Sequence, residues 1–289
     1  AYFLNNCSTP IHGRYTHGQP RRRRSLIAKY KQASRGNDRT SGANNDNGDS
    51  PPMFTRFRQL CLAAAGLCVF STPLMAATST PQPLFKNLSR AAPGLNPVAL
   101  QNALAAMQCA LNSGAEQAQR LAVIDYSQPS TARRLWIFDL RKQALVLQDL
   151  VAHGQKSGEN FATRFSNRVG SYQSSLGLFR TQESYQGKHG YSLRMDGLEP
   201  GVNDRARERA IVIHAADYVN PLWSKRQGRI GRSQGCPAVR PEIARRVIDK
   251  LKGGQFMYSW YPDRSLVKAS PYLNCQPRQV ARILAANGG

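Results

Sequence analysis

Ala210-Ile-Val-Ile-His214 and Ser233-Gln-Gly-Cys-Pro-Ala-Val-Arg240 are separated by a polar connection that contains glycine. The first run is apolar up to its histidine, which is typical of a buried strand that ends in a polar side chain. The second run places Cys236 directly after a glycine, in a loop. A base at a strand end and a thiol in a nearby loop are the two groups that nucleophilic acyl transfer needs.

A catalytic cysteine reacts as the thiolate, so it needs a partner that accepts its proton or stabilises its charge. His214 is the candidate base for Cys236. Gly235 allows the backbone to approach a substrate closely, and the amides of Gly235 and Cys236 are candidate donors to an oxyanion. A helix that begins near Pro241 adds a favourable positive pole if its axis points at the sulfur.

Other interpretations of these residues stay open at this point. A single Ser-x-Gly-Cys is a weak pattern, and a histidine after a strand is more often a hydrogen-bonded structural residue. His153 and His189 are rival bases that spacing does not exclude. A zinc site built on Cys236 and Cys275 needs four clustered ligands, and the sequence shows no such cluster. The residues alone therefore favour a cysteine acyl-transfer enzyme only modestly over these other interpretations.

The composition excludes a wholly disordered chain and points to an anionic partner. Of the 289 residues, 41% are hydrophobic, which is enough for a substantial core. The formal net charge of +23 predicts contact with an anionic surface. Cell-wall polymer, lipid head groups and nucleic acid all fit that charge, so charge alone does not choose among them.

Two N-terminal segments precede the expected catalytic region. Residues 1–52 are polar and turn-rich, so we expect a disordered or start-site extension, and its four consecutive arginines are not taken as a nucleic-acid site. Residues 53–77 begin with methionine, continue through an apolar run and end in small residues, as a secretory signal peptide does. We therefore expect an exported protein of the periplasm or cell envelope, with no transmembrane segment after signal cleavage and no nucleic-acid partner.

Signal cleavage leaves three of the six cysteines, which is enough for one disulfide in an oxidising compartment. A helix is predicted from Asn96-Pro97 to Asn112-Ser-Gly114, because cap, proline and stop signals are all in place. Cys109 lies opposite the apolar stripe of that helix, where a thiol has no packing reason to be. This favours a disulfide with Cys275, the alternative being a thiol in a small secondary contact.

The sequence from residue 118 to residue 275 predicts a mainly β domain with a few helices, an α+β class. Its strands are short runs of β-branched and aromatic residues, and its helix is an amphipathic run opened by proline and closed by glycine. The expected elements are a hairpin at 135–148, a strand at 210–213, a helix at 241–253 and a strand at 256–260. The flanking segments are a linker with the N-terminal helix at 78–117 and a C-terminal tail at 276–289.

The run His214 … Ser233-Gln-Gly-Cys236 resembles the His … Ser-His-Gly-Cys signature of the L,D-transpeptidase catalytic domain, a family that remodels bacterial peptidoglycan. Ser174-Ser-Leu-Gly-Leu-Phe179 and the hairpin are similar to further segments of that family, so the resemblance covers roughly residues 120–262. It implies a mixed β-sandwich of the L,D-transpeptidase type, preceded by a short helical segment. It implies no metal and no organic cofactor.

Carried over position by position, the resemblance implies that Cys236 is the nucleophile and His214 its general base. The amides of Gly235 and Cys236 are implied to form the oxyanion hole, and Ser233 to shape the loop around the substrate. Tyr191 is implied to be an aromatic wall near the donor.

The sequence departs from the family signature in two places. Gln234 stands where the signature usually has histidine. The arginine that commonly lies two residues after the cysteine is missing, and Arg240, two places further on, is the candidate group for binding substrate carboxylates. These departures leave the thiol and its base intact and affect the recognition of the donor.

The implied partners are peptidoglycan stem peptides. The resemblance implies that Cys236 attacks the carbonyl between diaminopimelate and the terminal D-alanine of a tetrapeptide stem, and that the acyl group passes to an amine of a neighbouring stem. Water as the acceptor makes the same site an L,D-carboxypeptidase. A third interpretation is a secreted basic wall-binding protein without turnover, and the intact Cys236 and His214 argue against it.

Overall fold

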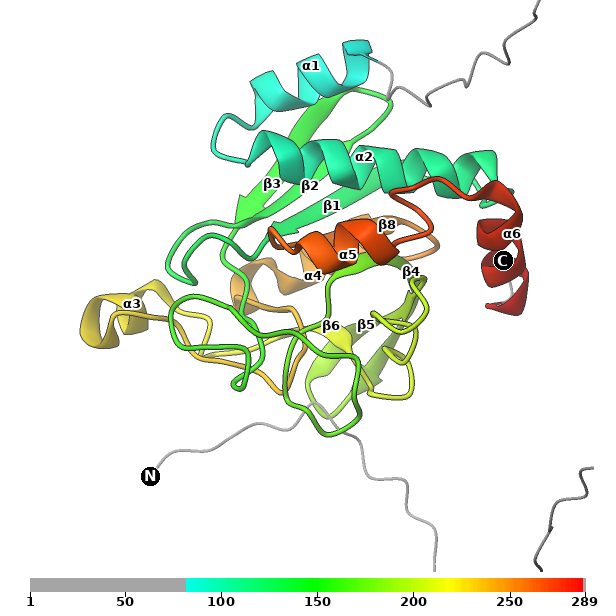
Figure 1. Ribbon diagram of the computed structural model, residues 1–289. Helices are drawn as coiled ribbons and strands as arrows, with labels where there is room; N and C mark the ends of the chain where they lie inside the picture. The colour runs from blue at the N-terminus through cyan, green and yellow to red at the C-terminus, as the bar shows by residue number, and fades with distance from the viewer. Residues whose placement is uncertain (1–81, 288–289) are drawn as a thin grey trace, which may run out of the picture. The chain divides into compact units, whose positions relative to one another are not determined.

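The computed structural model describes residues 82–287, and the expectations for residues 1–52 and 53–77 lie outside these described residues (Figure 1). The helices are α1 (Gln82–Ala91), α2 (Pro97–Asn112), α3 (Pro221–Gln227), α4 (Pro241–Leu251), α5 (Arg264–Ala269) and α6 (Pro277–Ala286). The strands are β1 (Arg120–Asp125), β2 (Leu135–Asp139), β3 (Ala144–Asp149), β4 (Gly177–Gly187), β5 (Gly190–Gly197), β6 (Val212–Ala215), β7 (Ala238–Val239) and β8 (Phe256–Trp260).

All eight strands of the described region belong to one sheet, in the order β3-β2-β1-β8-β4-β5-β6-β7. The pairs β1–β8 and β6–β7 are parallel, and the other neighbours are antiparallel. The predicted hairpin is β2–β3, and the strand predicted at 256–260 is β8. The strand predicted at 210–213 begins two residues later, as β6, because Ala210 has a positive φ of 52°. The predicted α+β class is therefore confirmed, and the short pair β6–β7 ends the sheet.

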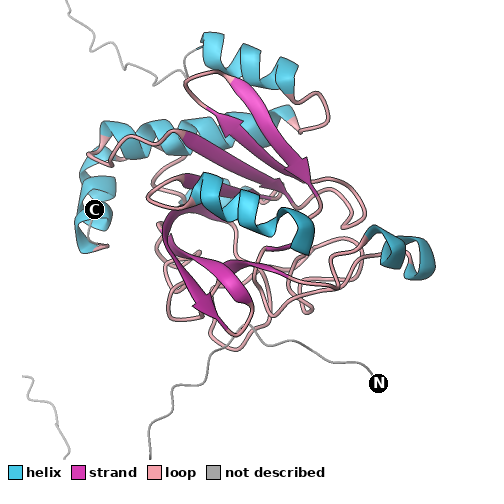
Figure 2. Cartoon of the chain, turned by 180° about the vertical axis from the view of Figure 1, so that it is seen from behind, coloured by secondary structure: helices cyan, strands magenta, loops and turns pink. Residues whose placement is uncertain are grey.

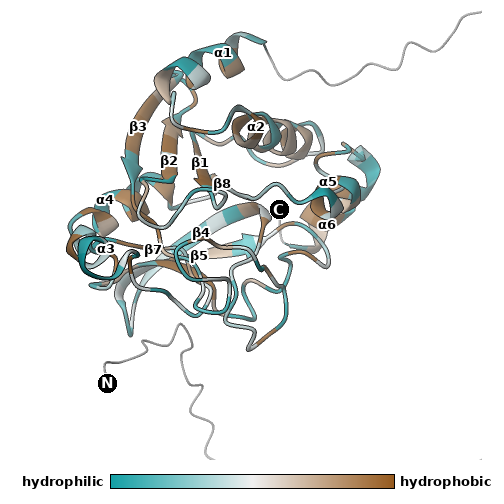
Figure 3. Ribbon diagram, turned by 60° about the vertical axis from the view of Figure 1, so that its left-hand side comes forward, coloured by the Kyte–Doolittle hydropathy of each residue, from teal (hydrophilic) through white to brown (hydrophobic). Residues whose placement is uncertain are grey.

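Both faces of the sheet are covered, as alternate residues of β1 show. Leu121 and Val123 face a core built with α1, α2 and α6, whereas Ala122 and Ile124 face a second core built with α4. Seen from behind, α4 lies in front of the strands (Figure 2). Hydrophobic residues run along β1 to β3 and along α2 (Figure 3). Burial on both faces holds the strands rigidly enough to position side chains at the end of the sheet.

α2 begins and ends where the sequence predicts. The Asn96 side chain accepts a hydrogen bond from the backbone N–H of Val98 at 2.9 Å, and Pro97 is the first helical residue. Cys109 is bonded to Cys275, with 5.4 Å between the two Cα atoms. The predicted disulfide is confirmed, and it ties α2 to the segment just before α6.

Two helices lie where the sequence predicts a linker and a tail. α1 buries Leu88, and α6 buries Val280 and Leu284, in the core that α2 lines. The tail expected at 276–289 is therefore wrong for residues 277–286. Helices of 10 residues are marginal in water by themselves, so contact with α2 rather than intrinsic propensity orders them.

Within residues 82–287 no helix is both long and apolar enough to cross a bilayer. The longest, α2, has 16 residues, whereas a spanning helix needs about 20 apolar ones.

Candidate active site

His214 lies on β6 between two paired strands. Its backbone is opposite Ser192 of β5 on one side and opposite Ala238 of β7 on the other. Its side chain is buried, with 1% of the residue exposed. Because neighbouring strands hold the backbone from both sides, the sheet rather than a loop sets the direction of the imidazole.

Two contacts define the state of the His214 ring. Nδ1 lies 2.7 Å from the carbonyl oxygen of Ala215, which only accepts, so Nδ1 carries the proton and Nε2 the lone pair. The ring of His189, from the turn between β4 and β5, stacks on it with 4.3 Å between centroids. Burial lowers the pKa of His214 to about 4; the Ala215 bond opposes the shift and the charge of His189 adds to it. His214 is therefore a neutral base at pH 7.

Cys236 lies beside the same strand. Its Sγ is 3.5 Å from the backbone nitrogen of Val212 and 3.7 Å from the carbonyl oxygen of Ala210. Val212 and His214 are two residues apart on β6, so their side chains point to the same face. Ala238, two residues after Cys236, pairs with His214. The fold thus brings the predicted thiol and the predicted base to the same end of the sheet.

Ser233 closes the turn that precedes Cys236. Its Oγ accepts from the backbone N–H of Gly235 at 3.0 Å and donates to the carbonyl oxygen of Cys236 at 2.7 Å. Gly235 has a φ of +125°, and a Cβ there would lie 2.7 Å from the carbonyl oxygen of Gln173, so the position requires glycine. The Gly235 amide is engaged inside the turn, which leaves the Cys236 amide as the stronger candidate for an oxyanion donor.

Two distant segments anchor this turn. Ser174 Oγ accepts from the backbone N–H of Gly154 at 3.0 Å and donates to the carbonyl oxygen of Gly235 at 3.2 Å. The backbone N–H of Ser233 donates to the carbonyl oxygen of His153 at 2.9 Å. The turn before Cys236 is therefore held at both ends by main-chain and hydroxyl contacts.

The rival base His153 is bonded through both ring nitrogens. Arg134 donates to its Nδ1 at 2.7 Å, so Nδ1 carries the lone pair and Nε2 donates to the carbonyl oxygen of Gly158 at 3.3 Å. Burial first, and then the charge of Arg134, lower the pKa of His153 to about 3. These contacts are those of a structural histidine, whereas His189 lies against the ring of His214.

Two buried arginines support the site, and sequence reasoning missed both. Arg134 is fully buried and also donates to the carbonyl oxygen of Val151 at 3.0 Å. Arg209 donates to the carbonyl oxygen of Gln173 at 2.6 Å and lies next to Gly235. Among the described residues no ion pair involves Arg209, so its charge adds a positive field beside the turn of Cys236. Only long-range contacts distinguish these arginines from the many others.

Tyr191 points to the face of the sheet that α4 covers, whereas His214 points to the opposite face. Its hydroxyl donates to Oδ1 of Asp249 on α4 at 2.8 Å. Successive residues of a strand point to opposite faces, so Ser192 shares the face of His214, its pairing partner. Tyr185 of β4 is directly opposite Ser192, so its side chain points to the same face of the sheet as His214. Tyr185 is therefore the aromatic residue on the face of His214. Cross-strand register, which the sequence does not show, decides between the two tyrosines.

Arg240 is engaged in a bidentate ion pair. Its Nε and Nη2 lie 2.8 and 2.5 Å from the two carboxylate oxygens of Asp149 at the end of β3. Arg240 also occupies the position directly before the first residue of α4, where its side chain makes no capping hydrogen bond. In this structure it joins the first turn of α4 to the sheet.

The structure gives no metal cluster around the thiol within residues 82–287. Cys275, considered above as a ligand together with Cys236, is bonded to Cys109. No three or more His, Cys, Asp and Glu side chains of the described region are grouped to hold a metal ion.

A family model for the L,D-transpeptidase catalytic domain matches residues 91–260. No curated protein matches the chain. The chain is similar to a solved L,D-transpeptidase from Mycobacterium smegmatis, with 14% identity, 50% of this chain and 59% of that chain covered, and a TM-score of 0.31. It is also similar to an L,D-transpeptidase from Stackebrandtia nassauensis, with 12% identity, coverages of 62% and 77%, and a TM-score of 0.31.

A third similar structure is L,D-transpeptidase 3 from Mycobacterium tuberculosis in complex with a faropenem-derived adduct. The identity is 13%, the match covers 50% of this chain and 60% of that chain, and the TM-score is 0.31. The chain thus spans about three fifths of the length of the two mycobacterial structures.

Proposed function

The chain belongs to the L,D-transpeptidase catalytic domain family, and on this premise we propose that it is an exported cysteine enzyme that cross-links peptidoglycan stem peptides. The observation that carries the proposal is the placement of Cys236 beside the strand of the neutral, buried His214. Export to the periplasm or cell envelope, through the signal at 53–77, is part of the proposal.

In the proposed mechanism, Nε2 of His214 accepts the proton of the Cys236 thiol. The thiolate attacks the carbonyl carbon between diaminopimelate and the terminal D-alanine of a tetrapeptide stem, and the backbone N–H of Cys236 donates to the oxyanion. The carbon–nitrogen bond then breaks, and His214 returns the proton to the leaving amine of D-alanine. A thioester remains on the sulfur.

In the second half, an amine of a neighbouring stem attacks the thioester, and His214 accepts the amine proton. The sulfur leaves and is reprotonated, which gives a new amide and the original thiol. Arg209 supports the thiolate through its positive charge beside the turn, and Ser233 holds the turn in shape. No metal or organic cofactor enters these steps.

A hydrolytic outcome is the second candidate, because water in place of the amine gives an L,D-carboxypeptidase from the same thioester. The burial of Cys236 and His214, 0% and 1% exposed, favours transfer, since a dry site protects the thioester from water. A non-catalytic wall-binding protein is a third candidate, and the presence of both Cys236 and His214 on neighbouring segments disfavours it, because a binder needs neither a thiol nor a base.

The products of a disaccharide-tetrapeptide substrate separate these functions. The purified protein is incubated with the substrate, and the products are identified by liquid chromatography and mass spectrometry. D-alanine release with cross-linked dimers supports transfer, whereas D-alanine release with tripeptide alone supports the carboxypeptidase. An unchanged substrate in the presence of bound protein contradicts both enzymatic functions.

A further inference from the structure

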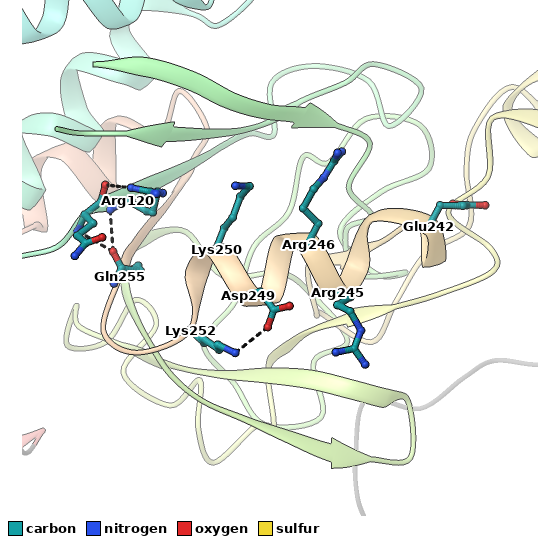
Figure 4. Close-up of a pocket in the computed structure, with 9 residues that line it drawn as sticks. Arg120, Glu242, Arg245, Arg246, Asp249, Lys250, Lys252 and Gln255 are labelled. Atoms are coloured by element: carbon teal, nitrogen blue, oxygen red, sulfur yellow. Dashed lines mark hydrogen bonds and ion pairs between the residues drawn. The ribbon is translucent and has the colours of Figure 1, made fainter. Parts of the chain in front are cut away.

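The outward face of α4 borders a cavity of about 740 Å³. The side of α4 that carries Ile243, Val247 and Leu251 is buried in the core, so the opposite side forms one wall of the cavity. The first residues of β1 and the segment after α4 form the rest (Figure 4). We call this the α4 cavity; its lining residues are Gln119, Arg120, Glu242, Arg245, Arg246, Asp249, Lys250, Lys252 and Gln255.

The α4 cavity lies on the other face of the sheet from the proposed base. Tyr191 of β5 bonds Asp249 of the cavity wall at 2.8 Å, so this residue of β5 points to the α4 side. The next residue, Ser192, points the other way together with His214, its pairing partner. A ligand of the cavity therefore occupies a site separate from the one that Cys236 serves.

The cavity carries an excess of positive charge that its own acids do not neutralise. Five of its nine lining residues are basic and two are acidic. One acid is already used, because Asp249 pairs with Lys252 at 2.8 Å. Arg120 is satisfied by Asp139 outside the cavity at 3.0 Å. The remaining basic side chains supply a field that attracts an anion.

Arg246 and Lys250 are the centre of this field. Neither takes part in an ion pair among the described residues. They lie one helical turn apart and extend to the same side of α4 (Figure 4). Like charges at this spacing destabilise a helix. The helix dipole favours Lys250 in the last turn, but it gives no such reason for Arg246 in the middle of the helix.

We propose that the α4 cavity binds the acidic stem peptide of a peptidoglycan strand, as an anchoring site separate from Cys236. The proposal rests on the proposed function in one respect, since peptidoglycan is taken to be the polymer on which the enzyme works. Arg246 and Lys250 bind the carboxylates of the stem. Glu242, at the open end of the helix, faces the amine that diaminopimelate carries.

The length and chemistry of the cavity fit a peptide better than a phosphate polymer. α4 has 11 residues and is about 16 Å long, which matches an extended peptide of about five residues. Gln255 and Gln119 add amide groups to one end of the cavity. Glu242 would repel a continuous polyanion, whereas a stem that alternates carboxylates, amides and an amine meets partners along the whole wall.

The test is co-sedimentation of the full chain with purified, phosphate-free peptidoglycan sacculi. The cavity variant is Arg246→Gln with Lys250→Gln. The matched control is Arg278→Gln with Arg282→Gln on α6, which removes the same charge at the same spacing from exposed residues that enter no ion pair of the described region. We expect the cavity variant to bind at least fivefold more weakly than the wild type, and the control to bind within twofold.

A soluble competitor identifies the ligand class. The free tetrapeptide stem is expected to displace wild-type protein from sacculi and to leave the residual binding of the cavity variant unchanged. Polyphosphate of equal charge that competes better than the stem contradicts the peptide assignment. Equal weakening in the cavity and control variants contradicts a specific site, because it indicates attraction by net charge alone.

Turnover of a soluble substrate keeps this proposal separate from the proposed function. The cavity variant is expected to release D-alanine from the soluble disaccharide-tetrapeptide at the wild-type rate, and Cys236→Ala to bind sacculi as the wild type does. A wild type that binds through the cavity but releases no D-alanine contradicts the proposed function alone. A wild type that releases D-alanine while the cavity variant binds sacculi normally contradicts the anchoring site alone.

Discussion

His153 and His214 are both buried, and both have a pKa far below that of a solvated histidine, yet their surroundings differ. Arg134 and a backbone carbonyl bind both ring nitrogens of His153, in a segment of loops and turns. His214 is held by the backbone of a paired strand and bonds Ala215 through Nδ1, and Cys236 lies beside the same strand. Burial alone therefore does not make a catalytic base. The nitrogen that carries the lone pair, and what faces it, decide between structure and chemistry.

Replacement of His214 by glutamine is expected to have the largest effect. Glutamine fills a similar volume but has no basic nitrogen, so kcat/KM for D-alanine release falls about 10²- to 10⁴-fold. The melting temperature, followed by circular dichroism, serves as the control and stays near that of the wild type. A variant that keeps full activity shows that His214 is not the base.

His153→Ala is expected to affect the free energy of unfolding instead. The substitution leaves the buried Arg134 donor without its acceptor, so stability falls by about 2 to 4 kcal/mol in a urea titration. The activity of the folded fraction stays within about tenfold of the wild type. A loss of activity as large as that of His214→Gln at unchanged stability would reverse the comparison.

The two histidines also predict how stability depends on pH. Their pKa values in the folded protein, about 3 for His153 and about 4 for His214, lie below the value near 6.5 of the unfolded chain. The unfolded state therefore binds protons first. Stability is fully present above pH 6.5 and is lost as pH falls toward 4 and then 3, by an amount on the order of 5 kcal/mol or more for the two histidines together.

Urea titrations of the wild type and of His153→Ala between pH 7 and pH 4 check this dependence. The variant lacks one of the two groups, so its curve is expected to be flatter. Protonation of His214 is expected to lower kcat/KM at acid pH, with a midpoint near pH 4. A midpoint near pH 6.5 indicates a solvated base and contradicts the buried His214 as the base.

Ser233→Ala is expected to have the smallest effect, because Ser233 links the two regions without reacting. Its backbone N–H still donates to His153, but the hydroxyl bonds to Gly235 and Cys236 are lost. kcat is expected to fall about tenfold, with a stability loss of about 1 kcal/mol. The matched control is Ser127→Ala, whose hydroxyl bonds Asp125 within a turn that contains no proposed catalytic residue; its activity is expected to stay at the wild-type level.

The local parts of the fold could be predicted from the sequence because local physics controls them. The cap at Asn96, the proline that begins α4 and the apolar runs of β6 and β8 each act within a few residues. The candidate pair Cys236 and His214 came from residue chemistry and from the family resemblance. The disulfide between Cys109 and Cys275 was predicted because Cys109 lies opposite the apolar stripe of its helix.

The remaining features depend on contacts between distant segments. α6 is ordered by contact with α2, so its own sequence suggests only a tail. The choice between Tyr191 and Tyr185 depends on strand register, and the partner of Arg240, Asp149, is 91 residues away. The roles of Arg134 and Arg209 depend on which carbonyls surround them, and no spacing along the chain encodes that.

The intact mass of the protein after brief incubation with the disaccharide-tetrapeptide tests the central claim most directly. The experiment compares the wild type with Cys236→Ala, in a mild reductant that keeps thiols reactive. The account predicts that the wild type gains the mass of the substrate less D-alanine, and that the variant gains nothing. The same adduct on Cys236→Ala, or D-alanine release by Cys236→Ala at the wild-type rate, would contradict Cys236 as the nucleophile.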